Sequence, residues 1–374
     1  MGLEAFALEP QPLALNRTLA NYVPLEVSTS GLGIISQLAS WVIRAVRRGV
    51  DVAHMMDFDL IYATNNNLFN LLAGLWIAKQ LHLPCVAVVH HLRWVDYRVL
   101  GEPGASSELS PSRYLRSLRD DGLSVGVSLT RVIGGYLESK FLPKFDGFIV
   151  VSKTVANQLS ALVQPNRIFV VGNAPLATKS ALQLATTRSM TAVFIGRIDE
   201  GKGIAELLNA WEKIVMQSPL AYLHIVGDGT LRRRMIAQAH RRGLDTHLRF
   251  DGFLEDTEVA KVRSQSRFFI TLSRTEGFGI ALAEALAAGL PVIAWDTPPL
   301  REIFGDCSAV FLCHQGNILE VVAASVKLLN ISENDWRVLS DRASSYSHRF
   351  SWAEVARKEL RALETVVEVS RSTR

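Results

Sequence analysis

The sequence predicts an α/β protein with two domains, each built on a parallel sheet. Both halves alternate short apolar runs with longer helical patterns, which is typical of βαβ units. The chain has 374 residues, which is enough for two such domains. The stretch from Arg267 to Ala294 shows the unit in full: an apolar strand, a polar turn with glycines, an Ala- and Leu-rich helix and a second strand.

Strands and helices can be placed along most of the chain from these patterns. In the first half we expect strands over 22–27, 59–63, 84–89, 144–152 and 168–173, and helices over 34–48 and 68–82. In the second half we expect strands over 192–195, 223–226, 248–254, 268–272 and 291–294, and helices over 204–215 and 280–288. Gly289 and Pro291 mark the end of the last of these helices. A final helix begins near Phe350, because apolar residues recur at helical spacing from Trp352 onward.

The domain boundary is predicted from a change in composition. Pro175 to Ser189 is polar and small and has no core pattern, so the interdomain linker is placed at 174–189. We therefore expect an N-terminal domain over 1–173, a C-terminal domain over 190–345, and a helix over 346–374 that returns to the first domain.

Composition narrows the class of protein. Hydrophobic residues make up 48% of the chain and charged residues 20%, as in a globular protein with a sizeable core. The net charge of +4 agrees with anionic ligands or a bilayer surface, and it does not single out nucleic acid. Three scattered cysteines indicate neither a disulfide framework nor a zinc site, so we expect a cytoplasmic protein. No apolar run approaches the roughly 18 residues of a membrane-spanning helix.

Two acids in the stretch from Arg267 to Ala294 suggest a binding site. Glu276 lies in the turn, and Glu284 follows on the helix with seven residues between them. A carboxylate on so apolar a helix needs strong donors or a cation, and the two hydroxyls of a ribose would suit it. The glycines of Gly277-Phe278-Gly279 let the backbone approach a ligand at a helix N-terminus. The alternative is a structural Glu beside a turn that has no ligand.

This Glu-x7-Glu pattern with Gly-Phe-Gly after the first Glu resembles family 4 of the retaining GT-B glycosyltransferases. The resemblance implies two Rossmann-like domains facing across a cleft and a nucleotide-diphosphate sugar as donor. It implies that Glu276 contacts the donor sugar, that Glu284 holds the nucleotide ribose, and that Gly277, Phe278 and Gly279 line the sugar and phosphate. The likeness is strong over about 190–305, moderate over 84–173 and poor before 58.

A basic pair in the loop after strand 192–195 agrees with this resemblance. Gly196-Arg197 and Lys202 stand at the carboxyl end of a strand and before a helix, where cations and the helix dipole favour an anion. The resemblance assigns the donor diphosphate to Gly196, Arg197 and Lys202. It also places Gly227, in a glycine turn, near the nucleotide, and the backbone of Leu254 near the base.

On the N-terminal side, His90 ends the buried strand 84–89 and, by the same resemblance, lies near the donor sugar. Residues 92–130 carry Arg, Trp and Tyr side chains and are expected to recognise an acceptor or to form a solvated lid. Only one strand is expected before residue 58, where the family usually has three. A reduced domain, a truncated start and a partner subunit that completes the domain are the three explanations.

The resemblance therefore implies a retaining hexosyltransferase that uses a UDP- or GDP-linked sugar and a glycan or lipid-linked acceptor. We expect catalytic roles for His90, Arg197, Lys202 and Glu276, no metal, and no cofactor besides the donor substrate. We expect no nucleic acid partner, and peripheral contact with the inner membrane face is compatible with a lipid-linked acceptor. The alternatives are a non-catalytic or partner-dependent relative that binds nucleotide sugar, and a GT-B isomerase or phosphorylase.

Overall fold

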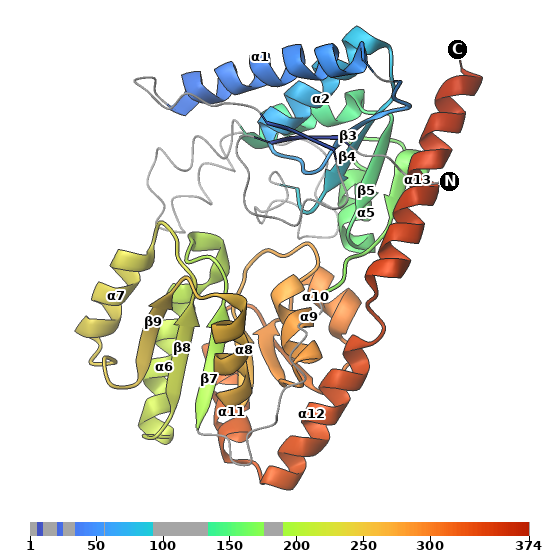
Figure 1. The fold of residues 1–374 in the computed structure, drawn as a ribbon. Coiled ribbons are helices and arrows are strands. Elements are labelled where there is room, and N and C mark those ends of the chain that lie inside the picture. Colours follow the sequence, from blue (N-terminus) through green and yellow to red (C-terminus); the bar gives the residue numbers. More distant parts are fainter. Residues whose placement is uncertain are drawn as a thin grey trace. The chain divides into compact units, whose positions relative to one another are not determined.

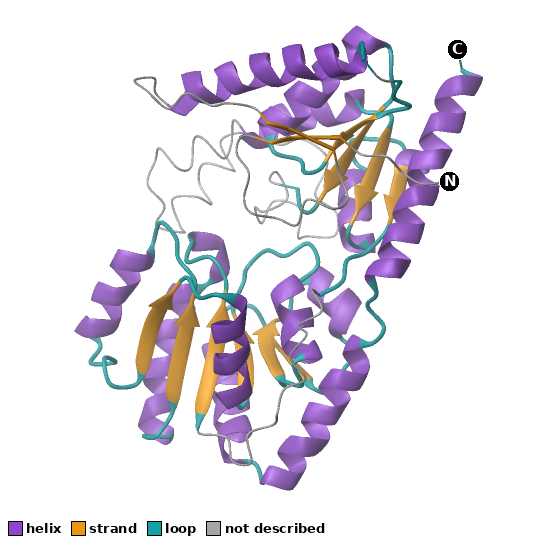
Figure 2. Cartoon of the chain, in the orientation of Figure 1, coloured by secondary structure: helices purple, strands orange, loops and turns teal. Residues whose placement is uncertain are grey.

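The computed structural model describes residues 6–9, 21–24, 34–55, 57–92, 134–175 and 190–373 (Figures 1 and 2). The chain forms two compact units. The first comprises Met1–Val151, Val155–Val171 and Lys358–Arg374, and the second comprises Ser152–Thr154 and Gly172–Arg357. Most of the predicted linker, 176–189, lies outside the described residues.

The first unit contains a four-stranded parallel sheet in the order β3-β4-β5-β6. β4 is buried along its whole length, as its unbroken apolar sequence predicts for a central parallel strand. The bounds of the strands are β3 (Ile61–Ala63), β4 (Cys85–Val89), β5 (Gly147–Val150) and β6 (Ile168–Val170). The helices that alternate with them are α1 (Ile34–Ala53), α2 (Leu68–Leu81), a helix over 134–141 and α5 (Lys153–Leu159), with the 3-10 turns η2 (Leu142–Lys144) and η3 (Pro165–Arg167).

In the described part of the chain before β3, two strands are present where only one was predicted. β1 (Phe6–Glu9) and β2 (Asn21–Pro24) pair with each other in parallel and form a separate two-stranded sheet. β1 was missed because its four residues, Phe-Ala-Leu-Glu, are too few to show a period of two.

The second unit contains a six-stranded parallel sheet in the order β12-β11-β10-β7-β8-β9. Numbered within this unit, the order from the other edge is 3-2-1-4-5-6, that of a doubly wound nucleotide-binding sheet. The direction of winding reverses between β7 and β10. The strands are β7 (Thr191–Ile195), β8 (Tyr222–Val226), β9 (Leu248–Gly252), β10 (Phe268–Thr271), β11 (Val292–Trp295) and β12 (Val310–Cys313).

Helices cover both faces of this sheet (Figure 2). α6 packs with α11 and α9 packs with α12. The helices are α6 (Ile204–Gln217), α7 (Arg232–Arg241), α8 (Asp256–Gln265), α9 (Ile280–Ala287), α10 (Pro298–Phe304), α11 (Ile318–Asn330), α12 (Glu333–Ser347) and α13 (Trp352–Ser372), with the 3-10 turn η4 (Glu200–Lys202). Buried tryptophans complete the core: Trp211 and Trp336 donate through Nε1 to the carbonyls of His247 and Arg267, at 3.0 and 2.6 Å.

The prolines at 298 and 299 begin α10. Thr297 precedes the helix with an extended backbone (φ −99°, ψ 151°), and the prolines occupy its first turn. Proline suits this place because the first N–H groups of a helix have no intrahelical acceptor and the ring presets a helical φ.

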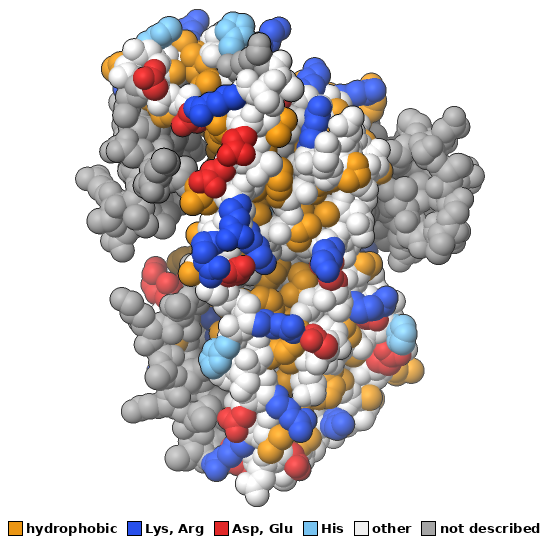
Figure 3. All heavy atoms as spheres, turned by 90° about the vertical axis from the view of Figure 1, so that its right-hand side faces the viewer, with side chains coloured by type: hydrophobic (Ala, Val, Ile, Leu, Met, Phe, Trp, Pro, Cys, Tyr) orange, Lys and Arg blue, Asp and Glu red, His pale blue; other side chains and the backbone are white. Residues whose placement is uncertain are grey.

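The final helix α13 is shared by the two units. Its residues as far as Arg357 belong to the second unit, and those from Lys358 onward belong to the first. On the face of the molecule that carries α13, Lys and Arg side chains lie next to Asp and Glu side chains (Figure 3). This mixed surface agrees with the small net charge of the chain.

Candidate functional site

The predicted basic loop and the predicted acidic turn meet in the second unit, at the carboxyl ends of β7 and β10. The Lys202 ammonium lies 2.7 Å from Glu276 Oε1, and their side chains are 25% and 18% exposed. Gly203 allows this approach: its φ is +65°, and a Cβ there would lie 2.0 Å from the Leu272 carbonyl oxygen at the end of β10. The two loops are also joined by a hydrogen bond of 3.0 Å from Arg274 N–H to the Gly201 carbonyl. This is the switch point of the sheet, where doubly wound proteins bind ligands.

Arg197 lies in the same loop but is placed differently. Its side chain is 79% exposed, and Nη2 lies 3.3 Å from Asp199 Oδ2. An exposed pair of this kind contributes little to stability and leaves the guanidinium able to reorient. Lys202 is therefore held in place, whereas Arg197 is a surface cation beside it. The helix α6 begins directly after this loop, so its positive N-terminal end faces the same region.

Two of the predicted glycines are in close contact. Gly227 has φ +126°, and a Cβ there would lie 2.0 Å from the Gly196 carbonyl oxygen. The Gly196 N–H donates to the Val226 carbonyl at 3.0 Å, which joins the ends of β7 and β8. Glycine at 227 thus has a structural cause in this unit that is independent of any ligand.

Glu284 is paired with a buried cation. The Arg263 guanidinium donates from Nη2 to Glu284 Oε2 at 2.6 Å, and the Arg263 side chain is only 4% exposed. Sequence reasoning expected a cation or donor for Glu284 but did not identify Arg263. No period or spacing links the last turn of α8 to the middle of α9, so only the tertiary structure shows this partner.

Phe278 was predicted to line the sugar and phosphate, and the structure corrects this for its side chain. The ring is buried in an aromatic cluster, with ring centroids 6.0 Å from Phe304 and 5.6 Å from Phe350. From sequence alone, a phenylalanine between two glycines could face either a ligand or the core. In the structure, its contacts with Phe304 of α10 and with Phe350, before α13, place it in the core. Only the backbone of Gly277, Phe278 and Gly279 remains available for the predicted role. Gly279 precedes α9 with φ +92°.

A second ion pair beside Lys202 and Glu276 was also missed. Arg274 donates through Nε to Glu206 Oε1 at 2.7 Å, which ties the loop after β10 to the first turn of α6.

Leu254 is half-buried and lies two residues beyond the end of β9, which stops at Gly252 rather than at 254 as predicted. No interaction described here tests its predicted contact with a base.

His90 directly follows β4 in the first unit, and its side chain is exposed. The neighbouring His91 carbonyl accepts a hydrogen bond from Asn66 Nδ2 at 2.7 Å, which holds this strand end in place. The predicted role of His90 near the donor sugar stays a prediction. The acceptor segment predicted over 92–130 lies outside the described residues, except for Leu92.

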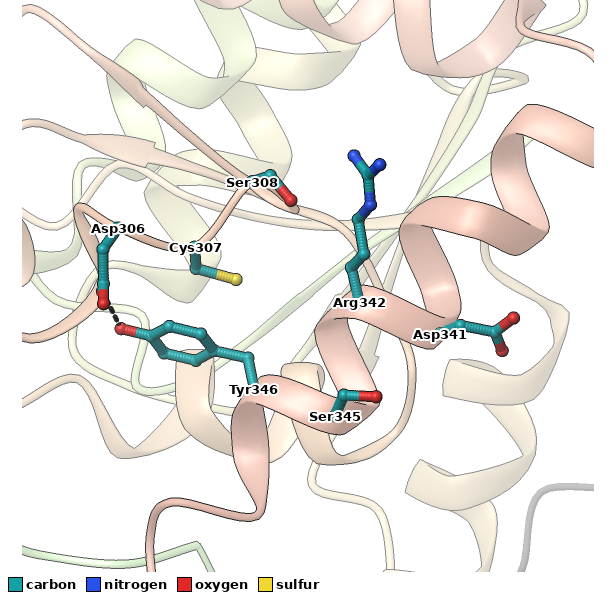
Figure 4. A pocket seen from close by; sticks show the side chains of 7 residues that line it. All are labelled: Asp306, Cys307, Ser308, Asp341, Arg342, Ser345 and Tyr346. Atoms are coloured by element: carbon teal, nitrogen blue, oxygen red, sulfur yellow. Dashed lines mark hydrogen bonds between the residues drawn. The ribbon is translucent and has the colours of Figure 1, made fainter.

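A pocket of about 440 Å³ lies elsewhere in the second unit (Figure 4). It is lined by Asp306, Cys307, Ser308, Asp341, Arg342, Ser345 and Tyr346. The Tyr346 hydroxyl donates to Asp306, and this bond, together with Arg349, lowers the pKa of the Asp306 carboxyl. Residues 306–308 precede β12, so the pocket is at the amino end of the sheet, opposite to the switch point. It is not the predicted donor site.

The described residues contain no group of three or more His, Cys, Asp or Glu side chains arranged to hold a metal ion, and metal independence stays a prediction. None of the helices in the described part of the chain has the length and apolar character needed to span a bilayer.

The second unit thus combines a doubly wound sheet with a cation, an acid and close-approach glycines at its switch point, where α/β proteins of this topology bind ligands. Each half of the chain matches the model of a known family. The model of glycosyl transferases group 1 matches residues 179–344, and the model of Glycosyltransferase Family 4 matches residues 14–174.

Individual relatives agree with these matches. The chain is 29% identical over 55% of its length to a GDP-mannose:cellobiosyl-diphosphopolyprenol alpha-mannosyltransferase of Xanthomonas oryzae, covering 55% of that protein. It is 36% identical over 47% of its length to a phosphatidyl-myo-inositol mannosyltransferase of Mycobacterium tuberculosis, covering 47% of that protein. The chain thus spans about half the length of the curated relatives that it matches.

A sucrose-phosphate synthase from Thermosynechococcus elongatus has the same fold. Its TM-score is 0.73 at 19% identity, over 97% of this chain and 88% of that one. The chain thus has the fold of this synthase, and each of its halves is similar to a glycosyltransferase family.

Proposed function

We propose that the protein is a retaining, metal-independent glycosyltransferase that moves a hexosyl group from a UDP- or GDP-sugar to a glycan or lipid-linked acceptor. The observation that carries the proposal is the contact between Lys202 and Glu276 at the switch point of the second unit. It brings a cation suited to a diphosphate and an acid suited to sugar hydroxyls within hydrogen-bonding distance of each other.

The leaving diphosphate is stabilised by charge that is already in place. Lys202 is anchored by Glu276 and by the close packing of Gly203 against Leu272, and the N-terminal end of α6 adds its dipole. Arg197, exposed and close in sequence, supplies a second cation as the diphosphate leaves. Lys202 and the helix end are fixed, so they stabilise a developing negative charge without rearrangement, and together with Arg197 they do the work that a metal ion does in other enzymes.

Transfer proceeds with retention and without a protein nucleophile in this proposal. The bond between the sugar C1 and the diphosphate oxygen breaks, and its electron pair stays on the diphosphate. The acceptor hydroxyl oxygen bonds to C1 on the same face, and its proton passes to a leaving phosphate oxygen. Glu276 holds the sugar hydroxyls, and Glu284 holds the ribose.

Mannose is the first sugar to test, with GDP as its carrier. Both relatives reported above are named as mannosyltransferases, and one name specifies GDP-mannose. Their names also specify a diphosphopolyprenol and a phosphatidyl-inositol, which favours a lipid-linked acceptor here. A lipid-linked acceptor in turn favours action at the cytoplasmic membrane face.

Thermal-shift binding against UDP-, GDP- and ADP-sugars and their nucleoside diphosphates tests the donor site. We expect one base series to stabilise the protein, and Lys202→Ala to abolish that shift. The absence of a shift with every nucleotide would overturn the proposal. Transfer from the stabilising donor to a lipid-linked acceptor then separates an enzyme from a relative that only binds. Binding without turnover until another subunit is added would favour the partner-dependent alternative.

A further inference from the structure

The contact between Arg263 and Glu284 joins two elements that no sequence pattern relates. Arg263 lies in the last turn of α8, and Glu284 lies in the middle of α9. Their side chains are 4% and 20% exposed, and Arg263 Nη2 lies 2.6 Å from Glu284 Oε2. Glu284 therefore has its outer part accessible, whereas its arginine is enclosed in the protein.

This asymmetry is what a ligand-binding carboxylate requires. A hydrogen bond between charged groups is short and directional, and a guanidinium fixes the plane of a carboxylate more firmly than an ammonium does. A carboxylate accepts about four hydrogen bonds, so the bond from Arg263 leaves capacity for two hydroxyl donors. The buried arginine thus balances the charge of Glu284 without occupying its accessible side.

We infer that Arg263 is a positioning residue for the nucleotide ribose: it holds the Glu284 carboxylate in the orientation that accepts the 2′ and 3′ hydroxyls. The inference rests on the proposed function, since it deepens the ribose role of Glu284. A carboxylate fixed for two hydroxyls discriminates strongly against a deoxyribose, because the missing hydroxyl leaves a partly buried acceptor without its donor.

The measured quantity is the ratio of dissociation constants for the 2′-deoxy and the ribo form of the nucleoside diphosphate that binds. We expect a ratio of about 10- to 100-fold in the wild-type chain, the range for a hydrogen bond to a charged group. Arg263→Lys keeps the charge but loses the planar fork, and we expect it to lower the ratio about tenfold. Glu284→Gln should lower it similarly, and the two changes together should lower it no further.

Arg267→Lys is the matched control. Arg267 is another buried arginine of the second unit, 8% exposed, and its guanidinium donates to the carbonyls of Leu328 and Ile331 at 3.2 and 2.9 Å. We expect this variant to lower the melting temperature and to leave the ribose ratio within about twofold of wild type. Its partners are the two carbonyls and the Glu333 carboxylate, 4.0 Å from Nη1, and none of them is Glu284. If Arg263→Lys acted through a general loosening of the second unit, Arg267→Lys would change the ribose ratio as well.

A second variant covers the case in which Arg263→Lys does not fold. Arg263→Gln with Glu284→Gln replaces the ion pair by two amides and leaves no unpaired charge in the interior. We expect this double variant to fold and to bind ribo and deoxyribo nucleotides within a few-fold of each other. In a transfer assay the donor KM should rise more than kcat falls, because the ribose is held alike before and during the reaction.

The outcomes separate the inference from the function on which it rests. If Glu284→Gln lowers the ribose ratio and Arg263→Lys does not, or if the double variant keeps the wild-type ratio, Arg263 has no positioning role and the inference is wrong. If a nucleotide binds but Glu284→Gln also leaves the ratio unchanged, the ribose role of Glu284 fails with it. If no nucleoside diphosphate binds the wild-type chain, the proposed function itself is overturned.

Discussion

Lys202 and Glu276 lie with their charged atoms 2.7 Å apart, although sequence comparison assigns them to different parts of the donor. Each is mostly buried, so each depends on the other to offset the loss of water around its charge. Lys202 and Glu276 are therefore a single electrostatic unit. Removing either one changes the surroundings of the other, and the two changes should have different effects.

Lys202→Ala should abolish transfer and nucleoside diphosphate binding. The change removes the cation and also leaves the Glu276 carboxylate unbalanced where a diphosphate must approach. We expect a loss of about 10³-fold or more in steady-state transfer, at the upper end for a lost electrostatic group. Lys213→Ala is the control. It changes an exposed lysine of α6, the helix that follows the Lys202 loop, and should behave as wild type. Normal turnover in purified Lys202→Ala protein would show that the site assignment is wrong.

Glu276→Ala should abolish transfer but keep binding of the nucleoside diphosphate. Without its carboxylate partner, Lys202 is free to contact the diphosphate, so affinity for GDP or UDP should be equal to or tighter than that of wild type. Calorimetric titration with the diphosphate and a transfer assay with the sugar nucleotide measure the two effects. Equal weakening of both ligands would show that Glu276 acts only by holding the loop.

Chelation should have little effect on activity. Lys202, Arg197 and the N-terminal end of α6 are proposed to carry the charge of the leaving group, so a divalent ion has no required role. We expect transfer in excess EDTA to stay within about twofold of the untreated enzyme, with Mg²⁺ and Mn²⁺ added back as controls. A complete loss that either ion restores would overturn the metal-free mechanism.

The arrangement of the second sheet could be predicted from sequence to a large extent. Most of its first five strands are apolar runs before a glycine or polar turn, although β9 contains Arg249 and Asp251. The sixth, β12, was not predicted because Val310–Cys313 has no clear flanking signal. Lys202 and Glu276 were both identified from their local motifs and the family resemblance, and they meet because loops after the neighbouring parallel strands β7 and β10 lie at the same edge of the sheet. Arg263 and the buried ring of Phe278 were not, because each depends on packing between helices that are adjacent only in three dimensions.

Gly227→Ala should destabilise the second unit far more than Gly316→Ala. Both glycines have positive φ, +126° and +88°, but a Cβ at 227 would lie 2.0 Å from the Gly196 carbonyl oxygen, whereas a Cβ at 316 meets nothing within 4 Å. We expect a loss of about 1–2 kcal/mol for Gly316→Ala from backbone strain alone. For Gly227→Ala we expect about 3 kcal/mol or more, because displacement of the β7 end is added. Urea unfolding of both variants checks this, and equal losses would contradict the close approach.

The three cysteines should resist alkylation in the folded protein. Cys85, Cys307 and Cys313 are buried and free, and burial is the main cause that raises the pKa of each thiol, to about 11 for Cys313. A thiol with a raised pKa holds little reactive thiolate at pH 8. We expect slow iodoacetamide labelling of the native chain and rapid labelling of all three in urea, read by mass spectrometry. Fast labelling of any of them in the native protein would show that this cysteine is accessible to the reagent rather than buried.

The sharing of α13 between the two units has a consequence for the order in which the protein matures. Val366 packs so closely on β5 that a Cβ at Gly147 would lie 2.4 Å from its Cγ2, and the Tyr62 hydroxyl donates to Glu359. The first unit therefore lacks part of its own interior until the ribosome has made the whole second unit. During synthesis, apolar surface of the first unit therefore stays exposed until the end of α13, which follows the second unit, has been made. The nascent chain should thus depend on a holding chaperone for its first half more than for its second.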